Sequence, residues 1–228
     1  MTRTAFDQEL KRLQDQVLAL GDLVEKAIVG AVDALRRRDG QAARDIMVAD
    51  REINRMRYAI ESDALVLIAT QQPMAVDLRT VAAMLEIAGE LERMGDYAKG
   101  IAKITIHMDS EPFVKPLVDI PLMAEKAREM LHRALEAFVQ RDVDLARAIA
   151  EQDDEMDRLL DRIHRDLMAL VIADPEIIRR ANYLMWVAHR LERTADRVVN
   201  ICERVIFTVT GEMMELDVRD EKDPVWLG

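Results

Sequence analysis

Two pairs of acidic residues with the same spacing occur about a hundred residues apart in the sequence. Glu92 and Asp96 form the first pair, and Glu192 and Asp196 form the second. A spacing of four residues places both carboxylates of a pair on one face of a helix, one turn apart. Each pair also continues an apolar seam of its helix, so we expect the carboxylates to lie against neighbouring helices and not in open solvent.

The neighbours of these carboxylates follow from two chain reversals, one near Pro73 and one near Asp174. In an antiparallel hairpin, residues at equal distances from the turn lie side by side, so each pair should meet oxygen-bearing side chains of the preceding helix. We call the two predicted groups the first cluster, which is Asp50, Asn54, Glu92 and Asp96, and the second cluster, which is Asp153, Asp157, Glu192 and Asp196.

Several carboxylates within a few ångströms repel one another, so such clusters raise pKa values or recruit cations. Arg93 and Arg193 could supply the cations as a supporting salt-bridge network, with Arg51, Lys99 and Arg197 as further candidates. A bound metal ion is the other solution. With oxygen donors alone, Mg²⁺, Ca²⁺, Mn²⁺ or iron is favoured over a tetrahedral zinc site. The two solutions stay open at this point.

The elements that must position these residues are helices, because the chain is rich in Ala, Leu, Met, Glu and Arg and has only 8 Gly and 6 Pro. Glycine and proline positions divide the chain into six expected helices. Their ranges are residues 6–38, 42–70, 76–108, 121–140, 142–172 and 175–210. The fold class expected is therefore all-α.

An internal repeat relates the two halves of the chain. A shift of 100 residues places Glu192 on Glu92 and Asp196 on Asp96, and a shift of 103 places Asp153 on Asp50. The chain is thus predicted to be two tandem three-helix bundles. The expected divisions are a first bundle over residues 1–110, a proline-rich linker over 111–121, a second bundle over 122–210 and an acidic C-terminal tail over 211–228.

Composition argues against several classes of function. The net charge of −11 disfavours nucleic-acid binding, which depends on basic residues that neutralise phosphates. A single cysteine, Cys202, gives no support for an oxidising compartment, and the longest strongly apolar run, residues 64–69, is too short to span a bilayer. We therefore expect a cytoplasmic protein that meets the membrane only through partners, and we expect Cys202 to be a buried, inert thiol.

Catalytic constellations are also weak. A ferritin-like di-metal enzyme needs a Glu-x-x-His on each of two helices, and only Glu129 with His132 has this spacing. We interpret His132 as a surface or interface residue. The chain is therefore not expected to be an enzyme, although a di-metal carboxylate oxidoreductase and a metal-free helical scaffold are kept as alternatives.

Three segments resemble signature segments of the PhoU family. They are residues 71–79 (QQPMAVDLR), 90–101 (ELERMGDYAKGI) and 189–201 (HRLERTADRVVNI). The resemblance covers residues 6–210. It implies a cytoplasmic accessory protein of the phosphate-specific ABC transporter, a negative regulator of the phosphate-starvation response and a homodimer. The partners it implies are the ATPase subunit of the transporter and a membrane sensor histidine kinase.

The resemblance also implies multinuclear metal sites built from paired acidic motifs. The positions that match the main motif are Glu92, Asp96, Glu192 and Asp196, and those that match its partner motif are Asp153 and Asp157. The first half departs from the pattern, because Asn54 stands where the second half has Asp157. An amide offers an oxygen but no charge, so the first site is expected to be the weaker one.

Overall fold

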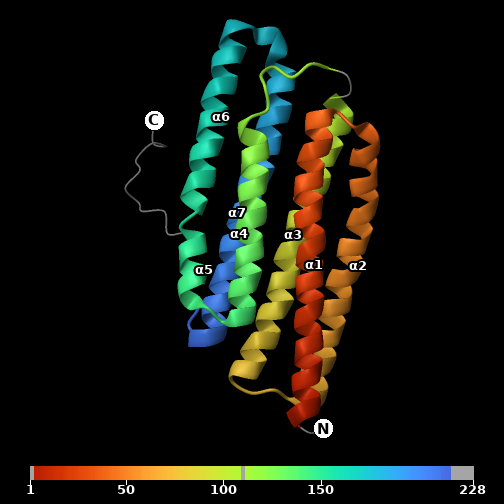
Figure 1. The fold of residues 1–228 in the computed structure, drawn as a ribbon, viewed down its shortest axis with the longest axis vertical. Coiled ribbons are helices and arrows are strands. Elements are labelled where there is room, and N and C mark those ends of the chain that lie inside the picture. The colour runs from red at the N-terminus through yellow and green to blue at the C-terminus, as the bar shows by residue number, and fades with distance from the viewer. Residues whose placement is uncertain (1–2, 109–110, 217–228) are drawn as a thin grey trace.

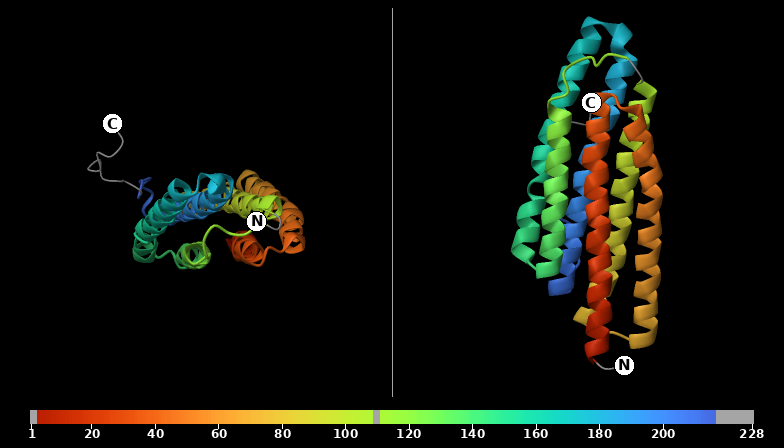
Figure 2. Two further views of the ribbon diagram at one scale, coloured as in Figure 1. Left: turned by 90° about the horizontal axis from the view of Figure 1, so that it is seen from above. Right: turned by 45° about the vertical axis from the view of Figure 1, so that its right-hand side comes forward.

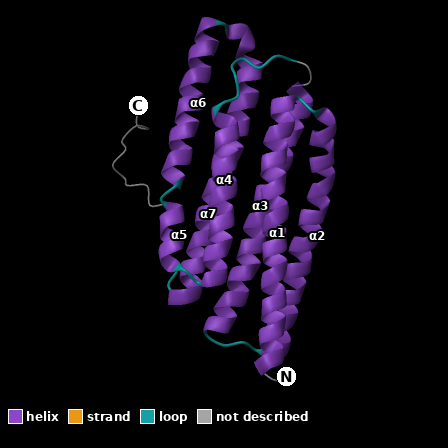
Figure 3. Ribbon diagram, viewed as in Figure 1, coloured by secondary structure: helices purple, strands orange, loops and turns teal. Residues whose placement is uncertain are grey.

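The protein is an elongated bundle of long helices that run along a common axis (Figure 1). The computed structural model describes residues 3–108 and 111–216. All regular structure within these residues is helical, as Figure 3 shows. The elements are α1 (Arg3–Arg37), α2 (Gly40–Gln71), α3 (Val76–Met108), α4 (Asp119–Gln140), α5 (Val143–Ala150), α6 (Asp153–Ala173), the short 3₁₀ helix η1 (Pro175–Ile177) and α7 (Ile178–Thr210).

Aspartates at equivalent places start a helix in each repeat. The Asp39 carboxylate accepts hydrogen bonds from the backbone amides of Gln41 at 3.1 Å and Ala42 at 2.9 Å. Asp142 accepts one from the amide of Leu145 at 2.9 Å. These amides have no partner within the helix, so a side-chain acceptor there stabilises the helix start by about 1 kcal/mol. The repeat seen in the sequence therefore preserves the same cap.

The fifth expected helix, residues 142–172, is two helices. α5 ends at Ala150 and α6 begins at Asp153, with a turn at Glu151 and Gln152 between them. The amide of Gln152 bonds to the carbonyl of Ile149 at 3.0 Å, so the chain tightens to a three-residue spacing at this point. The matching helix of the first repeat, α2, is continuous. The break places Asp153 in the first turn of α6, where a carboxylate interacts favourably with the helix dipole.

The helices pack in two rows. Viewed along the bundle, α6, α7, α3 and α2 form one row, and α4 and α1 cover its centre (Figure 2). The buried apolar side chains of the two repeats belong to one continuous cluster. Between the repeats, Glu90 of α3 pairs with Arg197 of α7 at 3.3 Å and accepts from Asn200 at 3.2 Å. The two repeats therefore share a core and are joined along α3 and α7.

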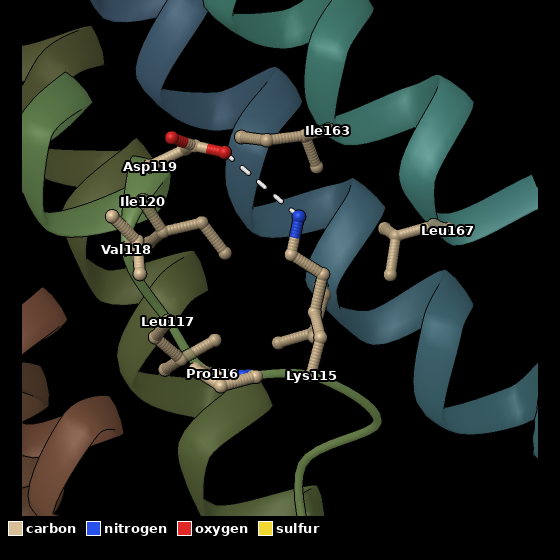
Figure 4. Close-up of a pocket in the computed structure, with 9 residues that line it drawn as sticks. Lys115, Pro116, Leu117, Val118, Asp119, Ile120, Ile163 and Leu167 are labelled. Atoms are coloured by element: carbon tan, nitrogen blue, oxygen red, sulfur yellow. Dashed lines mark ion pairs between the residues drawn. The ribbon is translucent and has the colours of Figure 1, made fainter. Parts of the chain in front are cut away.

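The segment between the repeats is held against the second repeat. Arg162 of α6 pairs with the buried Asp119 at 2.5 Å, and Lys115 pairs with Asp119 at 3.8 Å and also with Asp166 of α6. Figure 4 shows Lys115 and Asp119 facing each other beside Ile163. The cavity there is about 10 Å³, which is the space of one water molecule at most. These ion pairs thus anchor the linker to the second repeat, and the cavity offers no room for a larger ligand.

α4 begins at Asp119, two residues before the start expected at Pro121. Proline is tolerated in the first turn of a helix because its missing amide hydrogen has no partner there. At the other end of the chain, Gly211 closes α7 with a positive φ of 81°. The following residues turn back to α7, where the amide of Leu216 bonds to Glu203 at 3.0 Å. The rest of the predicted tail, residues 217–228, lies outside the described residues.

Candidate functional site

The first cluster lies where α2 and α3 pack side by side, and the second lies where α6 and α7 do. The reversals near Pro73 and Asp174 create both junctions, as the hairpin argument predicts. Each junction carries carboxylates on both of its helices. The two clusters therefore occupy equivalent places, one at each end of the longer row of helices.

Asp50 is the centre of the first cluster. Its side chain lies on α2 and is buried, with 4% of the residue exposed. Oδ2 pairs with Nζ of Lys99 at 2.6 Å and accepts a hydrogen bond from the side-chain amide (Nδ2) of Asn54 at 3.2 Å. Oδ1 is buried and has no hydrogen-bond partner among the described residues. The lysine is therefore the main compensation for the buried charge.

Lys99 joins the two helices of the first cluster. Besides Asp50 of α2, its Nζ lies 3.6 Å from the Asp96 carboxylate on its own helix. The hydrogen bond to Asp50 raises the pKa of Lys99, so the ammonium stays charged at neutral pH. The structure thus brings Asp50 and Asp96 to one cation, which agrees with the register predicted from the reversal near Pro73. The Asp96 side chain is 53% exposed, so the expectation that both carboxylates of the pair avoid open solvent is wrong for Asp96.

Glu92 completes the first cluster in an unfavourable electrostatic setting. Burial raises the pKa of its carboxyl group, and the charges of Asp96 and Asp50 raise it further. Arg57 of α2 opposes these effects. Arg93 opposes them as well, but burial and the two neighbouring carboxylates outweigh both arginines, so the net effect is a raised pKa for Glu92.

The second cluster is built on α6 and α7. Asp153 and Glu192 are both buried, with 7% and 8% of each residue exposed. Asp196 is partly buried and lies 3.7 Å from Arg193, one turn away on α7. Asp157 lies one turn after Asp153 on α6 and is partly exposed. Asp153 and Glu192, on adjacent helices, are therefore not part of a solvated surface.

The arginines predicted to support the clusters have different positions. Arg193 pairs with Asp196 of the second cluster, as expected. Arg93 pairs with Glu90 at 3.7 Å and not with a carboxylate of the first cluster. Lys99, which the sequence suggested only as a further candidate, supplies the cation expected from Arg93. The signal that identifies Lys99 is its position three residues after Asp96, on the same helix face, whereas Arg93 follows Glu92 directly and points elsewhere.

The positions of His132 and Cys202 agree with the roles expected of them, a surface residue and a buried thiol. His132 of α4 is exposed and lies 3.2 Å from Glu25 of α1, so it points away from the core of the bundle. Cys202 is fully buried, and desolvation raises the pKa of its thiol to about 12. Neither residue is placed to act as a metal ligand or nucleophile in the clusters.

The clusters do not form finished metal sites. Within the described residues, no three His, Cys, Asp or Glu side chains are grouped so that they could hold a metal ion. In the first cluster the ammonium of Lys99 occupies the space between the carboxylates, so that donor set does not fit a metal as it stands. The second cluster has four carboxylates, which is the donor chemistry of a hard cation. Metal binding there requires its carboxylates to draw closer together.

The fold and its two clusters define an all-helical protein made of two related helical repeats, the first with three helices and the second with its middle helix divided into α5 and α6. The family model for the PhoU domain matches the chain twice, over residues 17–105 and 120–205. This chain belongs to the PhoU family. The two matches coincide with the repeats found in the sequence.

Relatives with known names agree with this assignment. The chain is 34% identical over 218 residues to the "Phosphate-specific transport system accessory protein PhoU homolog" of Clostridium acetobutylicum, covering 95% of this chain and all of the relative. It is 31% identical to the corresponding PhoU protein of Escherichia coli, covering 98% of this chain and 92% of the relative. These proteins are named as accessory proteins, and the chain belongs to a family of accessory proteins, not of enzymes.

Two crystal structures have the same fold. PhoU from Pseudomonas aeruginosa is 33% identical and superposes with a TM-score of 0.86, covering 91% of this chain and all of that one. The phosphate transport system regulatory protein PhoU from Streptococcus pneumoniae is 32% identical, with a TM-score of 0.85, and covers 92% of this chain and 99% of that one. None of the described helices of the present chain is long and apolar enough to cross a membrane.

Proposed function

We propose that this chain is a cytoplasmic regulator of phosphate uptake and of phosphate-starvation signalling. The observation that supports this role is the doubled PhoU domain, shared along almost the whole chain with accessory proteins of the phosphate-specific transport system. A regulator acts by binding partners and needs no catalytic group.

The partners in this proposal are the ATPase subunit of the phosphate ABC transporter and a sensor histidine kinase, which the protein links as a negative regulator. A homodimer is part of the proposal. The elongated shape of the bundle and the core that its two repeats share support an adaptor, because a long molecule offers surface to more than one partner.

Co-purification tests this proposal. The full chain, at physiological salt and with or without phosphate and Mn²⁺, is expected to retain the ATPase subunit and the kinase from the same organism. An unrelated transporter ATPase and an unrelated kinase serve as matched controls. Loss of the chain is expected to raise expression of a phosphate-starvation reporter at high phosphate. Retention of neither partner under any of these conditions would refute the adaptor.

A hard metal ion at the second cluster is the second part of the proposal, with Mg²⁺, Mn²⁺ or iron favoured over zinc. Asp153, Asp157, Glu192 and Asp196 would hold the ion. Its charge would compensate the carboxylates that α6 and α7 bury together, and would tie these two helices to each other. Elemental analysis of protein purified without chelators is expected to find one of these metals. Metal-free protein under those conditions would contradict this part alone.

A further inference from the structure

The structure shows a cation already present in the first cluster. Nζ of Lys99 lies 2.6 Å from Asp50 and 3.6 Å from Asp96, and these carboxylates come from two different helices. Asp50 is almost completely buried, whereas the Lys99 side chain keeps 28% exposure at the rim. The lysine therefore enters from the surface and places its charge where a bound cation would have to make contact.

The charges of the first cluster are partly balanced without any ion. Its three carboxylates, those of Asp50, Glu92 and Asp96, lie near two cations, Lys99 and Arg57, and Arg57 also pairs with Glu61 at 3.4 Å. Like charges close together repel strongly inside a protein, where the effective dielectric constant is far below that of water. A divalent ion placed between Asp50 and Asp96 would meet the ammonium at contact distance.

The repeat makes the difference between the clusters explicit. The shift that pairs Asp96 with Asp196 places Val199 at the position of Lys99, and Val199 is a buried core residue. The shift that pairs Asp50 with Asp153 places Leu160 at the position of Arg57. At matched positions, the second repeat has neither of these two cationic side chains, and it carries Asp157 in place of Asn54.

We propose that Lys99 is a built-in cation that closes the first cluster to metal, so that metal regulation of this chain is confined to the second cluster. The confinement to the second cluster rests on the metal site proposed above. The closure of the first cluster stands on its own geometry. One repeat is thereby a permanent structural anchor between α2 and α3, and the other responds to metal availability.

Mn²⁺ binding to the full chain, stripped of metal with a chelator, tests the proposal. Calorimetric titration and elemental analysis after dialysis are applied to the wild type and to Lys99→Gln, Lys99→Val, Asp50→Asn, Asp153→Asn and the Lys99→Gln/Asp50→Asn double variant. Lys99→Gln keeps a hydrogen-bond donor for Asp50 and is the variant to use if Lys99→Val unfolds. Circular dichroism checks the fold of each protein.

Removal of the lysine is expected to open the first cluster. Lys99→Gln and Lys99→Val should each gain a Mn²⁺ binding event, with affinity at the first cluster higher by at least about tenfold, or about 1.4 kcal/mol. The double variant should lose this event. Asp50→Asn alone should bind as the wild type does.

Each other outcome separates the two proposals. If the wild type binds Mn²⁺ and Asp50→Asn removes that binding, the first cluster is open to metal and the closure by Lys99 is overturned. No gain in either Lys99 variant, with wild-type binding lost in Asp153→Asn, would also overturn the closure and support the second cluster. A gain in the Lys99 variants with no wild-type binding would support the closure and refute the metal at the second cluster. No binding in any protein would refute both.

Discussion

The first and second clusters occupy equivalent places in two homologous repeats, yet they compensate buried charge differently. At the first cluster, Lys99 of α3 pairs with Asp50 of α2, so the chain supplies its own cation. At the second, Val199 stands at the lysine position and Asp153 lies at the start of a separate helix, α6. The same acidic motif therefore has different cationic neighbours in the two repeats, which are Lys99 beside Asp50 and Asp96 in the first cluster and Arg193 beside Asp196 in the second.

The largest expected effect comes from removing the built-in cation. Lys99→Ala in chelator at neutral pH should lower the free energy of unfolding by about 3 kcal/mol, because the buried Asp50 loses its counter-ion. Chemical denaturation measures this loss, with the exposed Lys103→Ala on the same helix as a matched control. Adding Asp50→Asn to Lys99→Ala should recover much of the loss. Equal losses of stability in Lys99→Ala and Lys103→Ala would show that Asp50 does not depend on Lys99 as its counter-ion.

Metal should stabilise the fold through the second cluster alone. Mn²⁺ at about 100 times its dissociation constant should add about 2.7 kcal/mol to the free energy of unfolding. Thermal melts should show this gain in the wild type and in Asp50→Asn but not in Asp153→Asn.

Asp154→Asn is the matched control for that experiment. Asp154 is the exposed neighbour of Asp153 in the same helical turn, so its substitution makes the same change in net charge. It should leave the metal effect unchanged. Equal losses in Asp153→Asn and Asp154→Asn would point to general electrostatic attraction and would remove the contrast between the clusters.

A smaller effect is expected at Glu92. Its pKa is raised above the ordinary 4.5 by burial and by the charges of Asp96 and Asp50. A carboxyl group with a raised pKa in the folded state stabilises the fold when protonated. That contribution is complete below pH 4.5 and is lost as pH rises through the raised value. Glu92→Gln in chelator should therefore raise the melting temperature slightly at pH 7 and have little effect near pH 4. A lower melting temperature at pH 7 would show that the cluster stabilises the Glu92 anion.

The smallest expected effect is an absence of reaction at Cys202. Its equivalent in the first repeat is Ala102, and both residues are buried. With a thiol pKa of about 12, Cys202 should not react with a thiol reagent at pH 8 while the protein is folded, and should react fully in denaturant. Rapid reaction of the folded protein would show that α7 opens locally.

Much of the fold could be predicted from the sequence because its determinants are local or periodic. Asp39 and Asp142 mark helix starts, and the shared spacing of Glu92 with Asp96 and Glu192 with Asp196 reveals the repeat. The break between α5 and α6 could not be predicted, since neither Glu151 nor Gln152 is a residue that usually ends a helix. The register of the first hairpin was correct, because equal distances from a reversal leave few alternatives.

The set of helices, their duplication and the helix faces that carry the carboxylates can thus be derived from local sequence patterns. The choice of cation for each carboxylate depends instead on how the helices pack. Arg93 and Lys99 both lie within one turn of the acidic pair, and each has a long, flexible side chain that can reach several partners. The packing of α2 against α3 buries Asp50 and places it beside Lys99, and that burial makes one of the possible ion pairs much more favourable than the others.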